Sequence, residues 1–207
     1  MKRMMLLAVL TLALPLAAFA NNTIDFGNLS GTLTGTSSGM SLTANLTSVY
    51  GLPGFGTVQG TDLGTISFTT GSLIAGGSMT MGGSFNPGAL GSFVITSNGG
   101  GGLPSGVLFT GSFTGPVSWQ ISTLSNGNHQ YTLSGTVSGT LYNGTKVTGL
   151  SYEVTVSTTG KGFFNGKIGV GSGDLNVVSS VPEPGTLGLL GTGLIGLAGV
   201  LHRKLKS

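Results

Sequence analysis

Apolar residues alternate with Ser, Thr or Gly in many short runs between residues 21 and 180. In the run Tyr131–Leu141, the apolar residues fall at odd-numbered positions, and Ser or Thr fills each even-numbered position. A period of two is the repeat of side chains on one face of a β-strand, and β-branched Thr suits the solvated face. Turn signals such as Asn143-Gly144 separate the runs. The pattern predicts an all-β fold, an antiparallel β-sandwich or barrel of about ten short strands.

The same alternation predicts which side chains of each strand face the core. Val107, Phe109 and Phe113 share one phase and are expected to lie together on an inward face. The short segment Ser78–Met81 is a further candidate strand on the same grounds.

Four aromatic residues have two possible roles. Trp119, Tyr131, Tyr142 and Tyr152 fall in phase with aliphatic neighbours. This phase predicts that their rings pack inside the domain, because large aromatic side chains dominate protein cores. The alternative is that the four rings lie on the surface and form a platform on which sugars stack.

A short internal repeat accompanies the alternation. Leu29–Thr36 and Leu133–Thr140 are identical at six of eight positions. The similarity is consistent with a duplicated hairpin, with equivalent strands of two sheets, or with chance in a chain of such simple composition. No period of 20–50 residues recurs, which disfavours a long solenoid.

The composition excludes several classes of function. The chain has no cysteine, which rules out disulfides, thiol catalysis and thiolate metal sites. Between Asn21 and Val181 it has three lysines and four acids, a net charge of −1. Three lysines cannot build the basic face that nucleic acids require. The 40 glycines would suit a flexible linker, but the periodic apolar residues predict a folded domain instead.

The candidate catalytic and metal-binding side chains are few. His129 is the one histidine between residues 21 and 181, and no acid or nucleophile motif lies near it in the sequence. Asp25, Asp62, Glu153 and Asp174 are far apart along the chain, although two of them could meet in space as a glycosidase pair. A single carboxylate in the glycine-rich segment around Asp174 cannot complete a calcium site. We therefore expect a non-enzymatic domain without a catalytic, cofactor-binding or metal site.

The N-terminus has the three parts of a signal peptide. Met1–Arg3 is cationic, Met4–Leu14 is apolar, and Ala18-Phe19-Ala20 supplies small residues at a cleavage site. Cleavage between Ala20 and Asn21 is expected, because eleven apolar residues are too few to span a bilayer comfortably. The sequence predicts an exported protein.

The C-terminus has the parts of a membrane anchor with an exposed stem. Gly185–Leu201 is a run of 17 uncharged residues, which would reach about 25 Å as a helix, just enough to cross a bilayer core. A basic tail that includes Arg203 follows and would stay on the cytoplasmic side. Pro182 and Pro184 disfavour helix and hold Glu183 in an extended peptide. A processing enzyme could bind such a peptide.

This order of a proline-bracketed acid, an apolar helix and a basic tail resembles the PEP-CTERM sorting signal of bacterial exported proteins. The matching residues are Pro182, Glu183, Pro184 and Arg203. The resemblance implies recognition by an exosortase, a transpeptidase-like membrane enzyme. The alternative is a plain C-terminal anchor with a proline-rich stem.

The resulting domain prediction is a signal peptide at 1–20, an exported all-β domain at 21–180, and the sorting signal at 181–207. The resemblance extends weakly to the Gly/Thr-rich β-domains that often precede such signals. It implies a non-enzymatic protein of the cell surface or of the exopolysaccharide and biofilm matrix. The implied partners are signal peptidase, exosortase, the inner membrane transiently through 185–201, and extracellular polysaccharide. The alternative function is a carbohydrate-binding or adhesive module.

Overall fold

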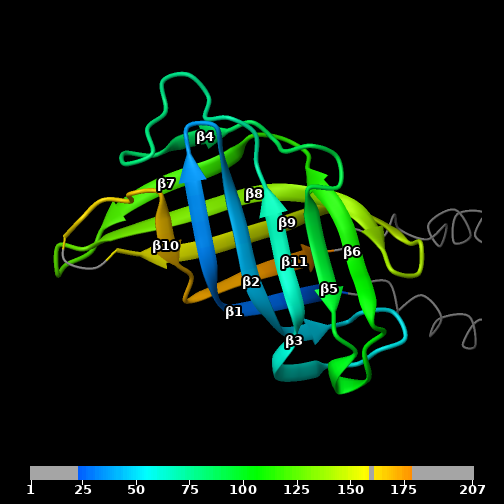
Figure 1. Cartoon of the computed structure of the whole chain (residues 1–207). Coiled ribbons are helices and arrows are strands. Elements are labelled where there is room, and N and C mark those ends of the chain that lie inside the picture. The colour runs from blue at the N-terminus through cyan, green and yellow to red at the C-terminus, as the bar shows by residue number, and fades with distance from the viewer. Residues whose placement is uncertain (1–22, 159–160, 179–207) are drawn as a thin grey trace, which may run out of the picture. The chain divides into compact units, whose positions relative to one another are not determined.

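The computed structural model describes residues 23–158 and 161–178, which are almost entirely β-structure (Figure 1). Their compact unit spans Thr23–Ser179. The elements are β1 (Thr23–Thr36), β2 (Gly39–Tyr50), β3 (Val58–Thr69), β4 (Gly83–Phe85), β5 (Phe93–Ser97), the 3-10 turn η2 (Gly100–Gly102), β6 (Gly106–Phe113), β7 (Val117–Thr123), β8 (His129–Leu141), β9 (Lys146–Ser157), β10 (Lys167–Gly169) and β11 (Ser172–Val178).

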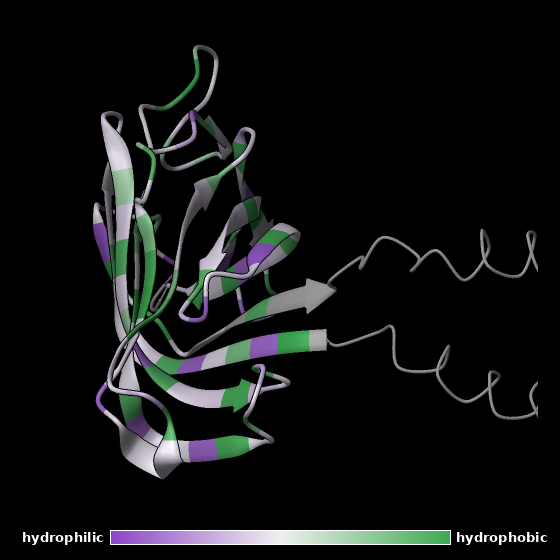
Figure 2. Cartoon of the chain, turned by 90° about the vertical axis from the view of Figure 1, so that its right-hand side faces the viewer, coloured by the Kyte–Doolittle hydropathy of each residue, from purple (hydrophilic) through white to green (hydrophobic). Residues whose placement is uncertain are grey.

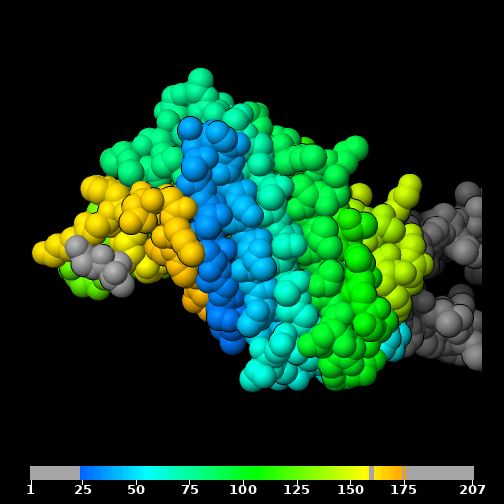
Figure 3. Space-filling view, in the orientation of Figure 1, coloured from blue at the N-terminus to red at the C-terminus, as the bar shows by residue number. Residues whose placement is uncertain are grey.

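Eight of these strands close into an antiparallel barrel. Their order is β8-β6-β5-β3-β2-β1-β11-β9, and β9 pairs back with β8. Five of them lie side by side on the face seen in Figure 3, from β1 in blue to β6 in green. The all-β prediction is confirmed, and of its two forms the structure adopts the barrel. Several strands are longer than expected, because β1, β2, β3, β8 and β9 each have 12 to 14 residues.

Three strands lie outside the ring and extend its long strands. β8 pairs with β9 along one edge, while its other edge is shared by β7 and β6 in succession. β1 is built in the same way, with β2 on one edge and β11 followed by β10 on the other. The two copies of the repeat, Leu29–Thr36 and Leu133–Thr140, lie in these two divided strands. Each copy also belongs to the first strand of a long hairpin.

An aromatic cluster fills the middle of the barrel. Phe93 stacks on Phe68 with ring centroids 5.6 Å apart, and Tyr152 meets Phe93 edge-on at 5.1 Å. Phe113 contacts the same group at 5.4 Å from Phe68. The four side chains are buried, and each comes from a different strand. Alternating bands of hydropathy along the strands show how the sequence directs such residues inward (Figure 2).

A second aromatic cluster fastens the segment before β4 to β7 and β8. Trp119 stacks on Tyr131 at 4.8 Å, and Phe164 packs edge-on against Trp119 at 5.3 Å. The Trp119 indole N–H donates to the Met79 carbonyl at 3.0 Å, and the Tyr131 hydroxyl donates to the Thr80 carbonyl at 2.8 Å. The Phe164 amide donates to the same hydroxyl at 3.2 Å. Buried polar tips of Trp and Tyr are thus paired, as burial requires.

Glycine permits one close approach inside the barrel wall. Gly111 of β6 lies opposite Gly139 of β8, and the Phe109 ring covers both. A Cβ on Gly139 would lie 2.2 Å from the Thr110 carbonyl oxygen and 2.6 Å from the Phe109 ring. The ring occupies the space that two side chains would otherwise fill. Glycine at these two positions therefore lets the Phe109 ring pack directly against the backbone of the two strands.

Two predictions of local structure are wrong. Val107 does not share the inward face of Phe109 and Phe113, because a bulge between β5 and β6 inserts Leu108, and Val107 is 51% exposed. Ser78–Met81 is not a strand. The Ser78 hydroxyl accepts the amide hydrogens of Thr80 and Met81, and this closes a turn.

Candidate functional site

Many hydroxyl side chains lie in register on the outer face of the barrel. One row crosses six strands from β1 to β8 and contains Ser or Thr at every position except Val94: Thr32, Thr43, Ser67, Val94, Thr110 and Thr140. Neighbouring hydroxyls bond across strands, with Thr65 and Thr96 at 2.7 Å and Thr132 and Thr155 at 3.3 Å. The side chains in this row are uncharged, and the hydroxyl groups among them can both donate and accept hydrogen bonds.

Three of the four aromatic residues considered for a surface platform are in the core. Trp119, Tyr131 and Tyr152 are fully buried, as their phase predicts. Tyr142 departs from the prediction and is 38% exposed, because β8 ends at Leu141 and Tyr142 begins the turn to β9. Its ring meets Phe55 edge-on at 5.9 Å, and its hydroxyl donates to the Pro53 carbonyl.

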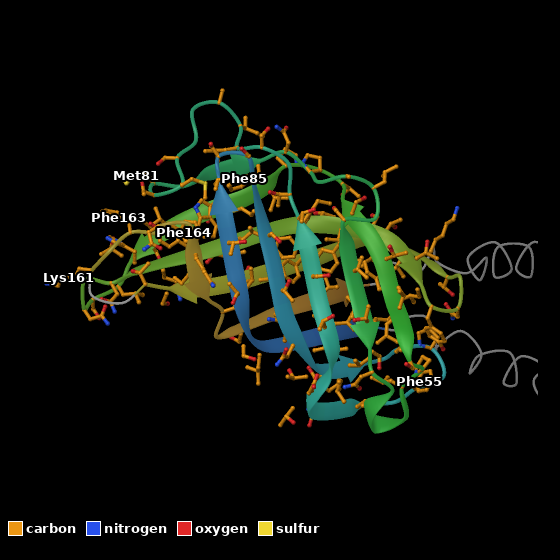
Figure 4. All side chains as sticks on the ribbon, in the orientation of Figure 1. Phe55, Met81, Phe85, Lys161, Phe163 and Phe164 are labelled. Carbon is orange, nitrogen blue, oxygen red and sulfur yellow. The ribbon has the colours of Figure 1, made fainter. Side chains whose placement is uncertain are left out.

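The exposed aromatic contacts lie far apart. Phe163 is 48% exposed and stacks on His129 with ring centroids 4.3 Å apart. Phe55 and Phe163 are at opposite ends of the barrel (Figure 4). Within the described residues, the two exposed pairs therefore do not combine into a row of rings on one sheet face.

His129 begins β8 and is half-buried. Its Nδ1 lies 3.2 Å from the Thr123 hydroxyl, and its backbone amide donates to the Thr158 hydroxyl at 3.1 Å. Its ring stacks on Phe163. These contacts hold His129 in place at the end of the barrel. They do not include the acid and the serine that a hydrolytic triad would need.

Acidic residues that are far apart in the sequence occupy neighbouring positions in the sheet. The register of β9 and β11 places Glu153 directly opposite Asp174, and Asp25 of β1 lies opposite Asn176 of the same β11. Strand pairing, which the sequence does not reveal, brings these positions into one region. Among residues 23–158 and 161–178, no group of three or more His, Cys, Asp or Glu side chains is placed to hold a metal ion. The absence of an active site stays a prediction.

Two shallow hollows mark places where the strands are irregular. One, of about 300 Å³, lies where β1, β2 and β3 are bulged and is lined by Asn28, Thr47, Tyr50 and Gln59 among others. The other, of about 450 Å³, lies beside β4 and β7 and is lined by residues that include Met81, Gly82, Gln120 and Ile121. Both are neutral in their side chains.

The predicted processing residues lie outside the described part of the chain. This applies to Ala20, Asn21, Pro182, Glu183, Pro184 and Arg203, and to the predicted membrane segment 185–201. In the described residues, no helix is long and apolar enough to cross a membrane. The assignment of the tail therefore depends on its sequence.

Residues 180–204 match the family model of the PEP-CTERM protein-sorting motif. The chain carries a PEP-CTERM sorting motif. The match contains all four of the residues singled out from the sequence, Pro182, Glu183, Pro184 and Arg203. No curated protein and no solved structure shows significant similarity to the chain. The PEP-CTERM motif supports an exported protein that an exosortase processes, whereas the role of each motif residue stays a prediction.

Proposed function

We propose that this PEP-CTERM protein is a non-enzymatic component of the cell surface or of the extracellular polysaccharide matrix. It is made as a precursor, exported through its signal peptide, held by 185–201 in the inner membrane, and then cut near Pro182–Pro184. The mature product is the barrel. The observation that carries the proposal is the sorting motif at 180–204, together with a barrel wall of neutral hydroxyl side chains.

The surface chemistry favours a matrix role over specific sugar binding. Carbohydrate recognition uses exposed aromatic faces on which sugar rings stack, and here Trp119, Tyr131 and Tyr152 are all in the core. A uniform Ser/Thr surface instead offers many weak hydrogen bonds to hydrated polysaccharide without selecting one ligand. The low charge of the barrel agrees with a partner that is neutral and hydrated.

The motif residues have separate proposed roles. Pro182 and Pro184 hold Glu183 in an extended peptide that the exosortase binds. The basic tail with Arg203 fixes the orientation through the excess of positive charge on the cytoplasmic side. The segment 185–201 contains six glycines, each of which lowers helix stability in water by up to about 1 kcal/mol relative to Ala. It is therefore suited to be a temporary anchor.

Processing is tested by replacing Pro182, Glu183 and Pro184 with alanine. Cells that carry the exosortase should release the wild-type product and retain this variant as an uncut membrane precursor. The matched control replaces the three preceding residues, 179–181, with alanine and should be processed normally. If the Pro182–Pro184 variant yields the same mature C-terminus by mass spectrometry, the tail acts as a plain anchor.

The matrix role is tested on the mature product. Wild-type protein should fractionate with the extracellular matrix, and the purified 21–180 domain should bind secreted polysaccharide weakly and without preference for one glycan. Tight, saturable binding to a single glycan would instead support a carbohydrate-binding module. Recovery of the mature protein in the free medium alone, with no association with cells or matrix, would contradict both.

A further inference from the structure

The eight-stranded ring leaves few strand edges open. A closed barrel has no edge strand of its own, so among the described strands the edge strands are β4, β10 and the part of β7 beyond β4. β4 is bonded on its second side by the segment before it, through the Ile74 amide to the Ser84 carbonyl and the Asn86 amide to the Ser72 carbonyl. β10 has three residues and carries Lys167. Short length and lysine are the usual protections of an edge strand.

β7 lacks these protections over its second half. β4 pairs with β7 only from Val117 to Trp119, and Gly82 lies beside the backbone of Gln120. Among the described residues no strand pairs with the same edge from Ile121 to Thr123. Gln120, Ser122 and Thr123 are exposed, and Ile121 is half-buried against the core. This segment contains no proline and no charge. An open, uncharged edge of this kind is a template for pairing with another strand.

The surroundings of this edge are also uncharged. The sequence has no Asp, Glu, Lys or Arg between Asp62 and Lys146, a range that includes β4, β6, β7 and most of β8. Lys161 lies at the turn beyond the end of β7, where its backbone amide donates to the Asn128 side chain. An edge without charge meets an identical edge without electrostatic repulsion, and a charged partner would gain nothing from it.

We propose that two copies of this protein associate through β7, pairing Ile121–Thr123 of one copy with the same residues of the other as antiparallel strands. A two-fold axis perpendicular to the sheet makes such a contact self-complementary and keeps outward residues opposite outward residues. The axis then passes midway between the two copies of one residue, and with Ser122 as this residue the pairing lies beyond the part of β7 that β4 covers. Ile121 of each copy lies opposite Thr123 of the other.

The hollow beside β7 fits this arrangement. With the pairing centred on Ser122, Leu124 of the second copy follows the paired residues on the side where Gly82 and Gln120 line a hollow. That Leu124 approaches the hollow of about 450 Å³ between β4 and β7, which Met81 and Ile121 line. Met81 is 65% exposed in the single copy and gains an apolar neighbour in the pair. The glycines Gly82 and Gly83 keep the hollow free of side chains.

The absence of cysteine allows a direct test in the full-length chain. Ser122→Cys places two thiols across the two-fold axis, where Cα atoms of opposed residues are about 4.5–5.5 Å apart and within reach of a disulfide. Ser151→Cys is the matched control, because Ser151 is equally exposed but lies on β9, which is paired on both sides. After mild oxidation of the exported protein, Ser122→Cys should run as a covalent dimer on a non-reducing gel and Ser151→Cys as a monomer.

A second pair of variants tests the contact without a new bond. Ser122→Lys places two ammonium groups across the axis and should weaken dimerisation by about tenfold or more, whereas Ser151→Lys should not change it. Trp119 is the only tryptophan and lies in β7, so its fluorescence confirms that each variant is folded. A folded Ser122→Cys chain that stays monomeric, equal cross-linking of both cysteine variants, or adducts only with other proteins would overturn the proposal.

Discussion

The Tyr131 hydroxyl joins three parts of the chain, and its removal should destabilise the barrel strongly. Tyr131→Phe deletes one oxygen and keeps the ring stacked on Trp119 at 4.8 Å. Two hydrogen bonds are lost, to the Thr80 carbonyl at 2.8 Å and from the Phe164 amide at 3.2 Å. A typical hydrogen bond contributes about 0.5–1.5 kcal/mol, and a buried donor left unpaired costs about 1–3 kcal/mol. We expect the free energy of unfolding to fall by about 2–4 kcal/mol.

Tyr142→Phe is the matched control, since it deletes the same atom at the surface. The Tyr142 hydroxyl donates to the Pro53 carbonyl, but the bond is exposed and water can replace it. The expected loss is at most about 1 kcal/mol.

The assay is urea and thermal unfolding of the purified 21–180 fragment, followed by circular dichroism and by the fluorescence of Trp119. In a domain of this size, 1 kcal/mol shifts the Tm by about 2–4 °C, so Tyr131→Phe should lower it by roughly 5–15 °C. Equal losses in the two variants, or a loss below about 1 kcal/mol for Tyr131→Phe, would show that the hydroxyl does not hold this end of the barrel together.

Three further predictions concern the barrel. The fragment 21–181 should fold alone, with a far-ultraviolet circular dichroism spectrum of β-type and one cooperative melting transition; a helical or random-coil spectrum would refute this. Gly139→Ala should cost about 1–3 kcal/mol in chemical denaturation, because its Cβ would lie 2.2 Å from a backbone oxygen, whereas Gly115→Ala enters open space and should be close to neutral. Asn28 is buried, and neither amide atom has a hydrogen-bond partner among the described residues, so Asn28→Leu should raise the free energy of unfolding by about 1–3 kcal/mol and, with it, the urea midpoint; a lower midpoint would mean that the amide is needed where it is.

Local alternation predicted the strands whose pairing is regular. In β8, Tyr131, Leu133, Val137 and Leu141 are all buried, as the period of two requires. The same argument is wrong for Val107, because the bulge at Leu108 depends on how β5 pairs with β6, and not on the sequence of β6 alone. Alternation within a strand does not show where pairing with the neighbouring strand leaves one of its residues as a bulge.

The choice between sandwich and barrel could not be made from the sequence for a related reason. Closure depends on the pairing of β1 with β11, which joins the two ends of the domain, and on the pairing of β11 with β9. The proximity of Glu153 to Asp174 and the open edge of β7 follow from the same strand order. The sorting motif was predictable because a processing enzyme binds a short linear peptide, and its residues are therefore contiguous in the sequence.

The pairing of the first strand with the last has a consequence for export. Thr23 of β1 lies opposite Val178 of β11, so the barrel cannot close before almost the whole domain has crossed the membrane. A chain that emerges N-terminus first must therefore keep β1 without its second neighbour until synthesis and translocation are nearly complete, and contacts of such sequence separation form slowly. β11 ends at Val178, four residues before Pro182. The proposed anchor at 185–201 would hold this end at the membrane while the slow last step occurs, and the proposed cleavage would then release a finished barrel instead of an open one.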